Sequence, residues 1–167
     1  MLFLRTCLAL VAVTVFSAYA QTPDLTSGLM NGAEPLPGVI TAGQPDEASL
    51  NALAEAGYVA VIDLRAANED RGFDEENAVK SLGMNYISIP ISGSDGITFE
   101  NAALLDATLS GIDGPVLVHC ASSNRVGALL SLREKINGAS DDDALRLGEA
   151  AGLSSLRATV EARLSEQ

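Results

Sequence analysis

The sequence predicts one α/β domain in which a mainly parallel sheet is covered by helices. Short runs rich in Val, Ile and Leu alternate along the chain with segments whose apolar residues recur every three or four positions. Strands and helices in alternation are typical of a parallel sheet built from strand-helix-strand units. The 167 residues fit one ordinary domain. We therefore expect an α/β three-layer sandwich with a helical C-terminal third that packs on one side of the sheet.

Each expected element has its own start or stop signal. Strands are apolar, β-branched runs that end at a turn or at a proline such as Pro90. Helices begin at N-caps such as Thr98 and Ser140 and end at glycines such as Gly57 and Gly83. The expected strands cover residues 39–42, 58–64, 84–89 and 115–119. The expected helices cover residues 46–56, 73–82, 98–109, 126–136, 140–151 and a last segment from Ser154 onward.

The first 20 residues have the features of a signal peptide. Arg5 precedes an almost unbroken apolar run at residues 7–16, and the tripeptide Ala-Tyr-Ala that ends at Ala20 fits a signal peptidase site. An N-terminal membrane anchor is the alternative, but the apolar run is short for a membrane span. We expect residues 1–20 to be removed and the rest of the chain to be exported to the periplasm.

The exported part divides into two regions. Residues 21–37 are rich in Pro, Gly, Ser and Asn and are expected to form a flexible leader. Residues 38–167 contain all the expected strands and helices and form the folded domain.

Composition excludes several classes of function. The chain carries 22 Asp and Glu against 10 Lys and Arg, a formal net charge of −12 at pH 7. An acidic chain repels phosphate backbones and anionic lipid, so neither nucleic acid nor a membrane surface is an expected partner. Cys120 is the only cysteine after residue 20, and His119 is the only histidine. Neither an intramolecular disulfide nor a zinc site of Cys and His ligands is therefore expected.

Candidate chemistry is concentrated between residues 119 and 125. Cys120 stands between an apolar strand and a helix, which is where α/β sheets bind ligands. The loop that follows can turn its N–H groups toward an anion, and Arg125 can hold two oxygens of a tetrahedral oxyanion. The same positive field favours Cys120 as a thiolate nucleophile. His119 is expected to orient the loop rather than to act as a base. The expected substrate-binding residues are His119, Ala121, Ser122, Ser123 and Asn124.

The segment Val118-His-Cys-Ala-Ser-Ser-Asn-Arg125 resembles the signature of the cysteine-dependent phosphatases, His-Cys, five residues, Arg. The chain is most similar to a small bacterial phosphatase-like family that is also found fused to beta-lactamase-like hydrolases. Other matching segments are Thr41-Ala-Gly-Gln-Pro45, Gly57-Tyr-Val-Ala-Val-Ile-Asp-Leu-Arg65 and Ile89-Pro90. The resemblance implies the dual-specificity-phosphatase-like fold and hydrolysis of a phosphomonoester, in a protein or a small molecule. It also implies a phosphocysteine on Cys120, with no metal and no cofactor.

Three features depart from this signature. Only four residues separate Cys120 from Arg125, one fewer than in tyrosine phosphatases, although the bacterial family shares this interval. Ser123 stands where related loops usually have glycine, at a turn that favours a positive φ. Val126 stands where phosphatases commonly carry a Ser or Thr that helps the thiolate leave. Slow hydrolysis of the intermediate is the expected consequence.

Other polar residues near this loop have less certain assignments. Asp95, in a loop of Gly and Ser, is the candidate general acid, because phosphatases of this type protonate the leaving oxygen with an aspartate on a mobile loop. An ordinary turn aspartate is the alternative. Arg65 is expected to form an ion pair with Glu69 or Asp70 rather than to contact substrate. Gln44 is either scaffolding or a contact at the rim of the site.

Two other functions remain open. The four-residue interval is also that of rhodaneses, sulfurtransferases that carry a persulfide on the cysteine, and a smaller ring suits one sulfur atom better than a phosphoryl group. The third hypothesis is a non-catalytic oxyanion-binding module. In this hypothesis, Ser123 and Val126 are signs that the chain has lost catalytic turnover. The flanking segments favour the phosphatase.

Overall fold

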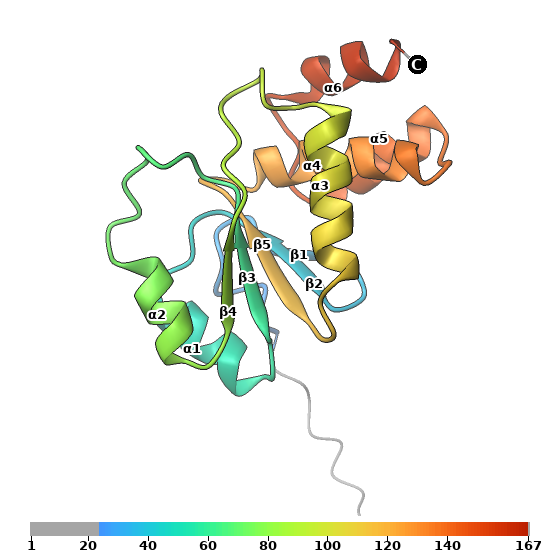
Figure 1. Cartoon of the computed structure of the whole chain (residues 1–167). Coiled ribbons are helices and arrows are strands. Elements are labelled where there is room, and N and C mark those ends of the chain that lie inside the picture. Colours follow the sequence, from blue (N-terminus) through green and yellow to red (C-terminus); the bar gives the residue numbers. More distant parts are fainter. Residues whose placement is uncertain (1–23, 167) are drawn as a thin grey trace, which may run out of the picture.

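A five-stranded sheet in the order β1-β2-β5-β3-β4 forms the centre of the molecule (Figure 1). The computed structural model describes residues 24–166, so the predicted signal peptide lies outside the described residues. β1 pairs with β2 in antiparallel fashion, and all other neighbouring strands are parallel. The strands are β1 (Ala33–Leu36), β2 (Val39–Ala42), β3 (Ala60–Asp63), β4 (Asn85–Ser88) and β5 (Val116–His119). The predicted three-layer α/β sandwich with a mainly parallel sheet is confirmed.

Six helices cover the two faces of this sheet among the described residues. They are α1 (Glu47–Glu55), α2 (Glu75–Ser81), α3 (Phe99–Ser110), α4 (Asn124–Ile136), α5 (Asp141–Ala150) and α6 (Arg157–Leu164). Figure 1 shows α1 and α2 on one side of the sheet and the remaining helices on the other. The helical C-terminal third therefore packs on one side, as predicted.

Side-chain alternation along the strands divides the core into two clusters. In β3, Val61 packs with residues of α1 and α2, whereas Ala60 and Ile62 pack with residues of α3 and α4. Leu117 in β5 belongs to the first cluster and Val118 to the second. All five side chains are buried. The strands that carry the site are thus covered on both faces, as is typical of parallel sheets.

The segment 21–37, predicted to be a flexible leader, contains an element that the sequence analysis missed. Residues 33–36 form β1, the edge strand, and Leu29 packs in the core with an exposure of 7%. Pro37 and Gly38 separate β1 from β2, and Gly38 has φ +74°. Pro and Gly are the residues that a tight turn with a positive φ favours at these positions. The composition that suggested flexibility instead encodes a hairpin turn.

Helix α4 is fixed by an unusually close crossing with α5. A Cβ atom on Gly148 would lie 2.7 Å from the carbonyl oxygen of Gly127, and one on Gly127 would lie 2.5 Å from the carbonyl oxygen of Gly148. Only residues without side chains allow the backbones to approach this closely. The contact holds in place the helix whose first turn carries Arg125.

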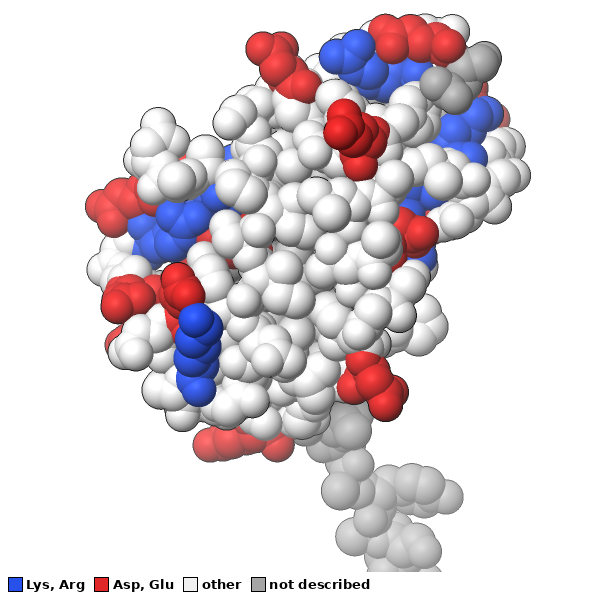
Figure 2. Space-filling model, in the orientation of Figure 1, with Lys and Arg blue, Asp and Glu red and all other residues white. Residues whose placement is uncertain are grey.

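Charged side chains on the viewed face are dispersed. Figure 2 shows Lys and Arg next to Asp and Glu, with a middle region that carries few charges. Within the described residues, no helix combines the length and the apolar character that a membrane crossing requires.

Candidate functional site

The loops that follow four strands meet around Cys120. His119, the last residue of β5, is in register with Ala42 in β2 and with Asp63 in β3. The carboxyl ends of these parallel strands therefore lie at one edge of the sheet, where α/β proteins bind ligands. Cys120 is 1% exposed and its backbone N–H donates to the carbonyl oxygen of Ala42 at 3.3 Å. The site is thus built on the rigid centre of the sheet.

The loop after Cys120 leaves backbone donors free. Within residues 24–166, the N–H groups of Ala121 and Ser122 have no protein acceptor. The loop ends at Ser123, whose φ of 66° turns the chain into α4 at Asn124. The first N–H groups of a helix lack intrahelical partners and carry a partial positive charge. The loop can therefore offer several N–H groups to an oxyanion.

The side chains of Ser123 and Asn124 point to the segment between α5 and α6. The Ser123 hydroxyl donates to the carbonyl oxygen of Ala151 at 2.7 Å. The Asn124 side chain accepts from the N–H of Ser154 at 2.8 Å and donates to the hydroxyl of Ser155 at 2.7 Å. These two predicted substrate-binding residues thus use their side chains to hold the loop. Any contribution of Ser123 and Asn124 to anion binding would therefore come from their backbone N–H groups.

A serine at position 123 is accommodated by its surroundings. Its left-handed backbone is strained for a residue with a Cβ atom. The hydrogen bond to Ala151 compensates for part of this cost, and the neighbouring Gly152 leaves room, since a Cβ atom on it would lie 2.5 Å from the Cβ of Ser123. The substitution of the usual glycine therefore preserves the turn.

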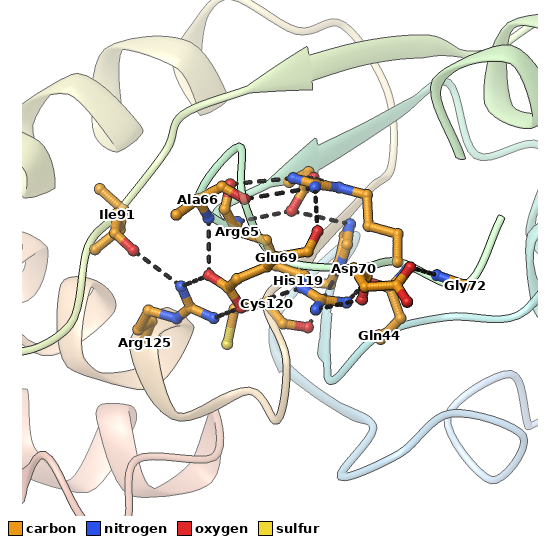
Figure 3. Close-up of polar contacts among 12 residues, drawn as sticks. Gln44, Arg65, Ala66, Glu69, Asp70, Gly72, Ile91, His119, Cys120 and Arg125 are labelled. Atoms are coloured by element: carbon orange, nitrogen blue, oxygen red, sulfur yellow. Dashed lines mark hydrogen bonds and ion pairs between the residues drawn. The ribbon is translucent and has the colours of Figure 1, made fainter. Parts of the chain in front are cut away.

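Arg125 is held at one edge and free at the other (Figure 3). Its Nη1 donates to Glu69 Oε1 at 2.5 Å and to the carbonyl oxygen of Ile91 at 2.9 Å, and its Nη2 donates to Glu69 Oε2 at 2.8 Å. A guanidinium has five N–H donors in a fixed plane. Three are used here, and the N–H on Nε with the second N–H on Nη2 form the other edge. The hydrogen bond to Glu69 raises the pKa of Arg125 above its ordinary value against the effect of desolvation, and nearby Cys120 acts in the same direction.

Glu69 joins two arginines of the site. In addition to Arg125, it accepts from Arg65 Nε at 3.2 Å and from the N–H of Ala66 at 2.8 Å. The hydrogen bond from Arg125 is the largest of the causes that lower the pKa of Glu69 to about 2. Glu69 is therefore a carboxylate at neutral pH. The predicted ion pair between Arg65 and Glu69 is confirmed, but the sequence analysis did not assign Glu69 to the site.

Gln44 and Glu75 extend this network to His119. The Gln44 side chain accepts from Arg65 Nη1, and its Nε2 donates to Glu75 Oε2 at 2.8 Å. Glu75 Oε1 lies 2.8 Å from His119 Nε2. Gln44 is therefore scaffolding, which answers the question that the sequence left open. Glu75, with an exposure of 1%, was missed because its position in the first turn of a helix is ordinary for an acidic residue.

Asp63, Glu75 and His119 are buried, and their ligand-type atoms lie within 4.8 Å of one another. Protein donors already occupy Asp63: the guanidinium of Arg71 at 2.6 and 2.7 Å, the hydroxyl of Tyr86 at 2.6 Å and the N–H of Arg65 at 2.7 Å. A cation at this point would have to displace Arg71. We therefore assign the group to the hydrogen-bonded support of the loop rather than to metal binding.

Asp95, the predicted general acid, lies on the exposed loop between β4 and α3. With Ser94 it lines a shallow hollow whose other wall is α6, including Arg163. Among the described residues its carboxylate has no hydrogen-bond partner, so it is free to form a new contact. Its role as an acid stays a prediction.

Comparisons with known proteins agree with this geometry. A family model described as the phosphatase-like domain of beta-lactamase hydrolase-like protein matches residues 36–137. A beta-lactamase hydrolase-like protein of Xylella fastidiosa (strain Temecula1) is 33% identical over 123 residues, which are 71% of this chain and 28% of that protein. The chain thus spans about a quarter of the length of the curated relatives it matches.

Solved structures share the fold. TpbA of P. aeruginosa, in complex with pTyr, has a TM-score of 0.59 at 19% identity, with 90% of this chain and 91% of that chain covered. Human DUSP28 has a TM-score of 0.55 at 13% identity, with 81% of this chain and 94% of that chain covered. At these identities the likeness concerns the fold, and the predicted dual-specificity-phosphatase-like architecture is confirmed.

The pKa of Glu69 predicts how its contacts respond to acid. A carboxylate whose pKa is lowered from 4.5 to about 2 stabilises the folded state above pH 4.5, and this stabilisation is lost as the pH falls through about 2. Glu69→Gln should therefore lower the free energy of unfolding most near neutral pH, and the difference from wild type should shrink between pH 4.5 and 2. Urea unfolding across this range measures it. Glu76→Gln, which changes an exposed carboxylate paired with Lys80, is the control; a Glu69→Gln difference that is constant with pH would contradict the assignment.

Proposed function

Because the chain belongs to the family of phosphatase-like domains of beta-lactamase hydrolase-like proteins, we propose that it hydrolyses phosphomonoesters through a phosphocysteine on Cys120. The family supports a phosphatase-like hydrolase in general. The observation that carries the finer proposal is the free edge of Arg125 beside Cys120, together with unpaired N–H groups in the same loop. This combination suits a tetrahedral dianion bound directly against a sulfur nucleophile.

The proposed reaction has two steps. The thiolate of Cys120 attacks phosphorus, the bond from phosphorus to the ester oxygen breaks, and the leaving oxygen takes a proton from Asp95. Water then attacks the phosphocysteine and gives a proton to the Asp95 carboxylate, the bond from phosphorus to sulfur breaks, and the thiolate of Cys120 is restored with release of inorganic phosphate. Arg125 and the loop N–H groups hold the non-bridging oxygens in both steps.

Phosphorylated proteins and small phosphoesters are the proposed substrates. A relative in fold, TpbA, has been solved with pTyr, which makes an aryl phosphate a reasonable first probe for this chain. The formal charge of −12 argues against a nucleic acid partner and against stable association of the processed chain with an anionic membrane.

The four-residue interval between Cys120 and Arg125 supports a second candidate, a rhodanese-type sulfurtransferase. The Cys120 thiolate would then attack the outer sulfur of a donor such as thiosulfate, forming a persulfide as the sulfur–sulfur bond of the donor breaks and sulfite leaves. A thiophilic acceptor such as cyanide would take that sulfur as thiocyanate and restore the thiolate. Sulfur transfer without phosphate-ester hydrolysis would favour this candidate. Inactivity in both assays, with phosphate still stabilising the fold through Arg125, would favour a non-catalytic oxyanion-binding module.

Substitutions of Cys120, the proposed nucleophile, and of Arg125, which would hold the phosphate oxygens, test the main proposal. Cys120→Ser should abolish hydrolysis of p-nitrophenyl phosphate, since a serine hydroxyl is not ionised at neutral pH. Arg125→Lys should lower kcat/KM by about a hundredfold, because a lysine cannot hold two oxygens and the Glu69 carboxylate at once. Arg133→Lys, on the same helix but paired with Asp106, should have little effect. Undiminished hydrolysis of p-nitrophenyl phosphate by Cys120→Ser would contradict the proposal.

Asp95 is tested through the leaving group. Asp95→Asn should slow hydrolysis of phenyl phosphate by about a hundredfold and that of p-nitrophenyl phosphate much less, because a weakly basic nitrophenolate leaves without a proton. Asp113→Asn, an exposed aspartate in the loop before β5, is the matched control. An equal effect on both esters, or no effect, would identify Asp95 as an ordinary turn residue.

Export is proposed on the features of residues 1–20 alone, which lie outside the described residues. Mass spectrometry of the chain recovered from the periplasm of a bacterial host should find Gln21 at the N-terminus. Full-length protein in the membrane fraction would instead indicate the anchor.

A further inference from the structure

The segment that precedes β1 is fixed against the rest of the domain next to the loop after Cys120. Leu29 is 7% exposed and packs in the core. The carbonyl oxygen of Met30 accepts from the N–H of Gly43, the residue after β2, at 2.7 Å. These contacts fix the position of Asn31, the residue that follows.

Asn31 holds one carbonyl group of the loop of residues 121–124. Its Nδ2 donates to the carbonyl oxygen of Ser122 at 3.1 Å, and no other protein donor reaches that oxygen within the described residues. The preceding carbonyl oxygen, that of Ala121, accepts from the N–H of Gln44 at 3.3 Å. The C=O and N–H of a trans peptide unit point in opposite directions. The two donors therefore turn the N–H groups of the same peptide units away from themselves.

The peptide unit that Asn31 holds is strained in its observed orientation. It joins Ser122 to Ser123, whose φ of 66° is left-handed although the residue has a Cβ atom. Rotation of this single unit by half a turn would bring φ of Ser123 to a negative value, which a serine favours. The same rotation would point the Ser122 carbonyl oxygen to the side that the N–H of the unit now faces. It would also break the hydrogen bond from Asn31, so this bond opposes the rotation.

We propose that Asn31 is a positioning residue that keeps the peptide unit between Ser122 and Ser123 in the orientation needed for oxyanion binding. A carbonyl oxygen turned into the loop would repel a bound phosphate, whereas an N–H group attracts it. The strain that Ser123 introduces in place of glycine is thus opposed by an amide on another segment. This inference rests on the proposed function of the loop. The segment that carries Asn31 lies outside residues 36–137, which the family model matches.

Phosphate binding in a double-mutant cycle tests this role. Asn31→Gly removes the amide and tolerates the φ of 50° at this position. Inorganic phosphate, titrated into the ¹⁵N-labelled full-length chain, should bind about fivefold more weakly to Asn31→Gly than to wild type, because one hydrogen bond that favours the binding orientation is lost. In the Ser123→Gly background the same change should weaken binding by less than about twofold, because glycine accepts a positive φ without strain. Equal losses in both backgrounds, or no loss in either, overturn the proposal.

The orientation of the peptide unit can also be followed without phosphate. The distance between the Hα of Ser122 and the amide proton of Ser123 depends on how this unit is turned, so the NOE between the two protons should change in Asn31→Gly. Asn137→Gly, which alters an exposed asparagine at the opposite end of α4, is the matched control. It should leave both the NOE and phosphate binding as in wild type. An unchanged NOE in Asn31→Gly overturns the proposal.

These measurements separate the role of Asn31 from the proposed reaction. If wild type binds phosphate but does not hydrolyse p-nitrophenyl phosphate, the proposed reaction fails and the binding cycle still decides on Asn31. If wild type hydrolyses the ester and Asn31→Gly binds phosphate as tightly as wild type, the reaction stands and the role of Asn31 is wrong. If wild type binds no phosphate, both proposals fail.

Discussion

The pairing of Glu69 with Arg125 is the constraint on which the site depends. An arginine with free rotation could turn toward solvent, whereas one held at two nitrogens by a carboxylate presents its other edge in a fixed direction. Glu69 is itself fixed by Arg65 and by the N–H of Ala66. The direction in which the chain can clamp an oxyanion is therefore determined by the loop after β3, some fifty residues before Arg125 in the sequence.

The same contacts continue into a chain of polar groups that brackets Cys120 from both sides. From Arg125 it passes through Glu69, Arg65, Gln44 and Glu75 to His119, the residue before the cysteine. Arg125, Glu69 and Arg65 alternate in charge along this chain, and the neutral amide of Gln44 joins Arg65 to the carboxylate of Glu75. Removing one member would leave its neighbours buried and unpaired, which costs more than the lost contact itself. The network therefore favours one geometry of the loop over alternative geometries, in addition to stabilising the fold.

The sequence predicted the parts of the site that are local and left out those that depend on long-range contacts. A strand, a His-Cys pair, a short polar loop, an arginine and a helix follow one another in sequence, so Cys120 and Arg125 could be singled out directly. Glu75 has no local signal, because an acidic residue in a first helical turn is common. Its burial against His119 comes from the packing of α2 over the sheet. β1 was missed for a related reason: a short edge strand followed by Pro and Gly has the composition of a loop.

The shortened loop and its unusual residues can be understood from the groups around them. Ser123 keeps the left-handed turn because Ala151 accepts its hydroxyl and Gly152 leaves space, so the segment after α5 replaces what a glycine would have provided. Val126 is fully buried and offers no hydroxyl to a departing thiolate. A thiolate, however, is stabilised by nearby positive charge in the same way whether it attacks or leaves. In the proposed mechanism, Arg125 would therefore assist both steps and would compensate in part for the hydroxyl that Val126 lacks.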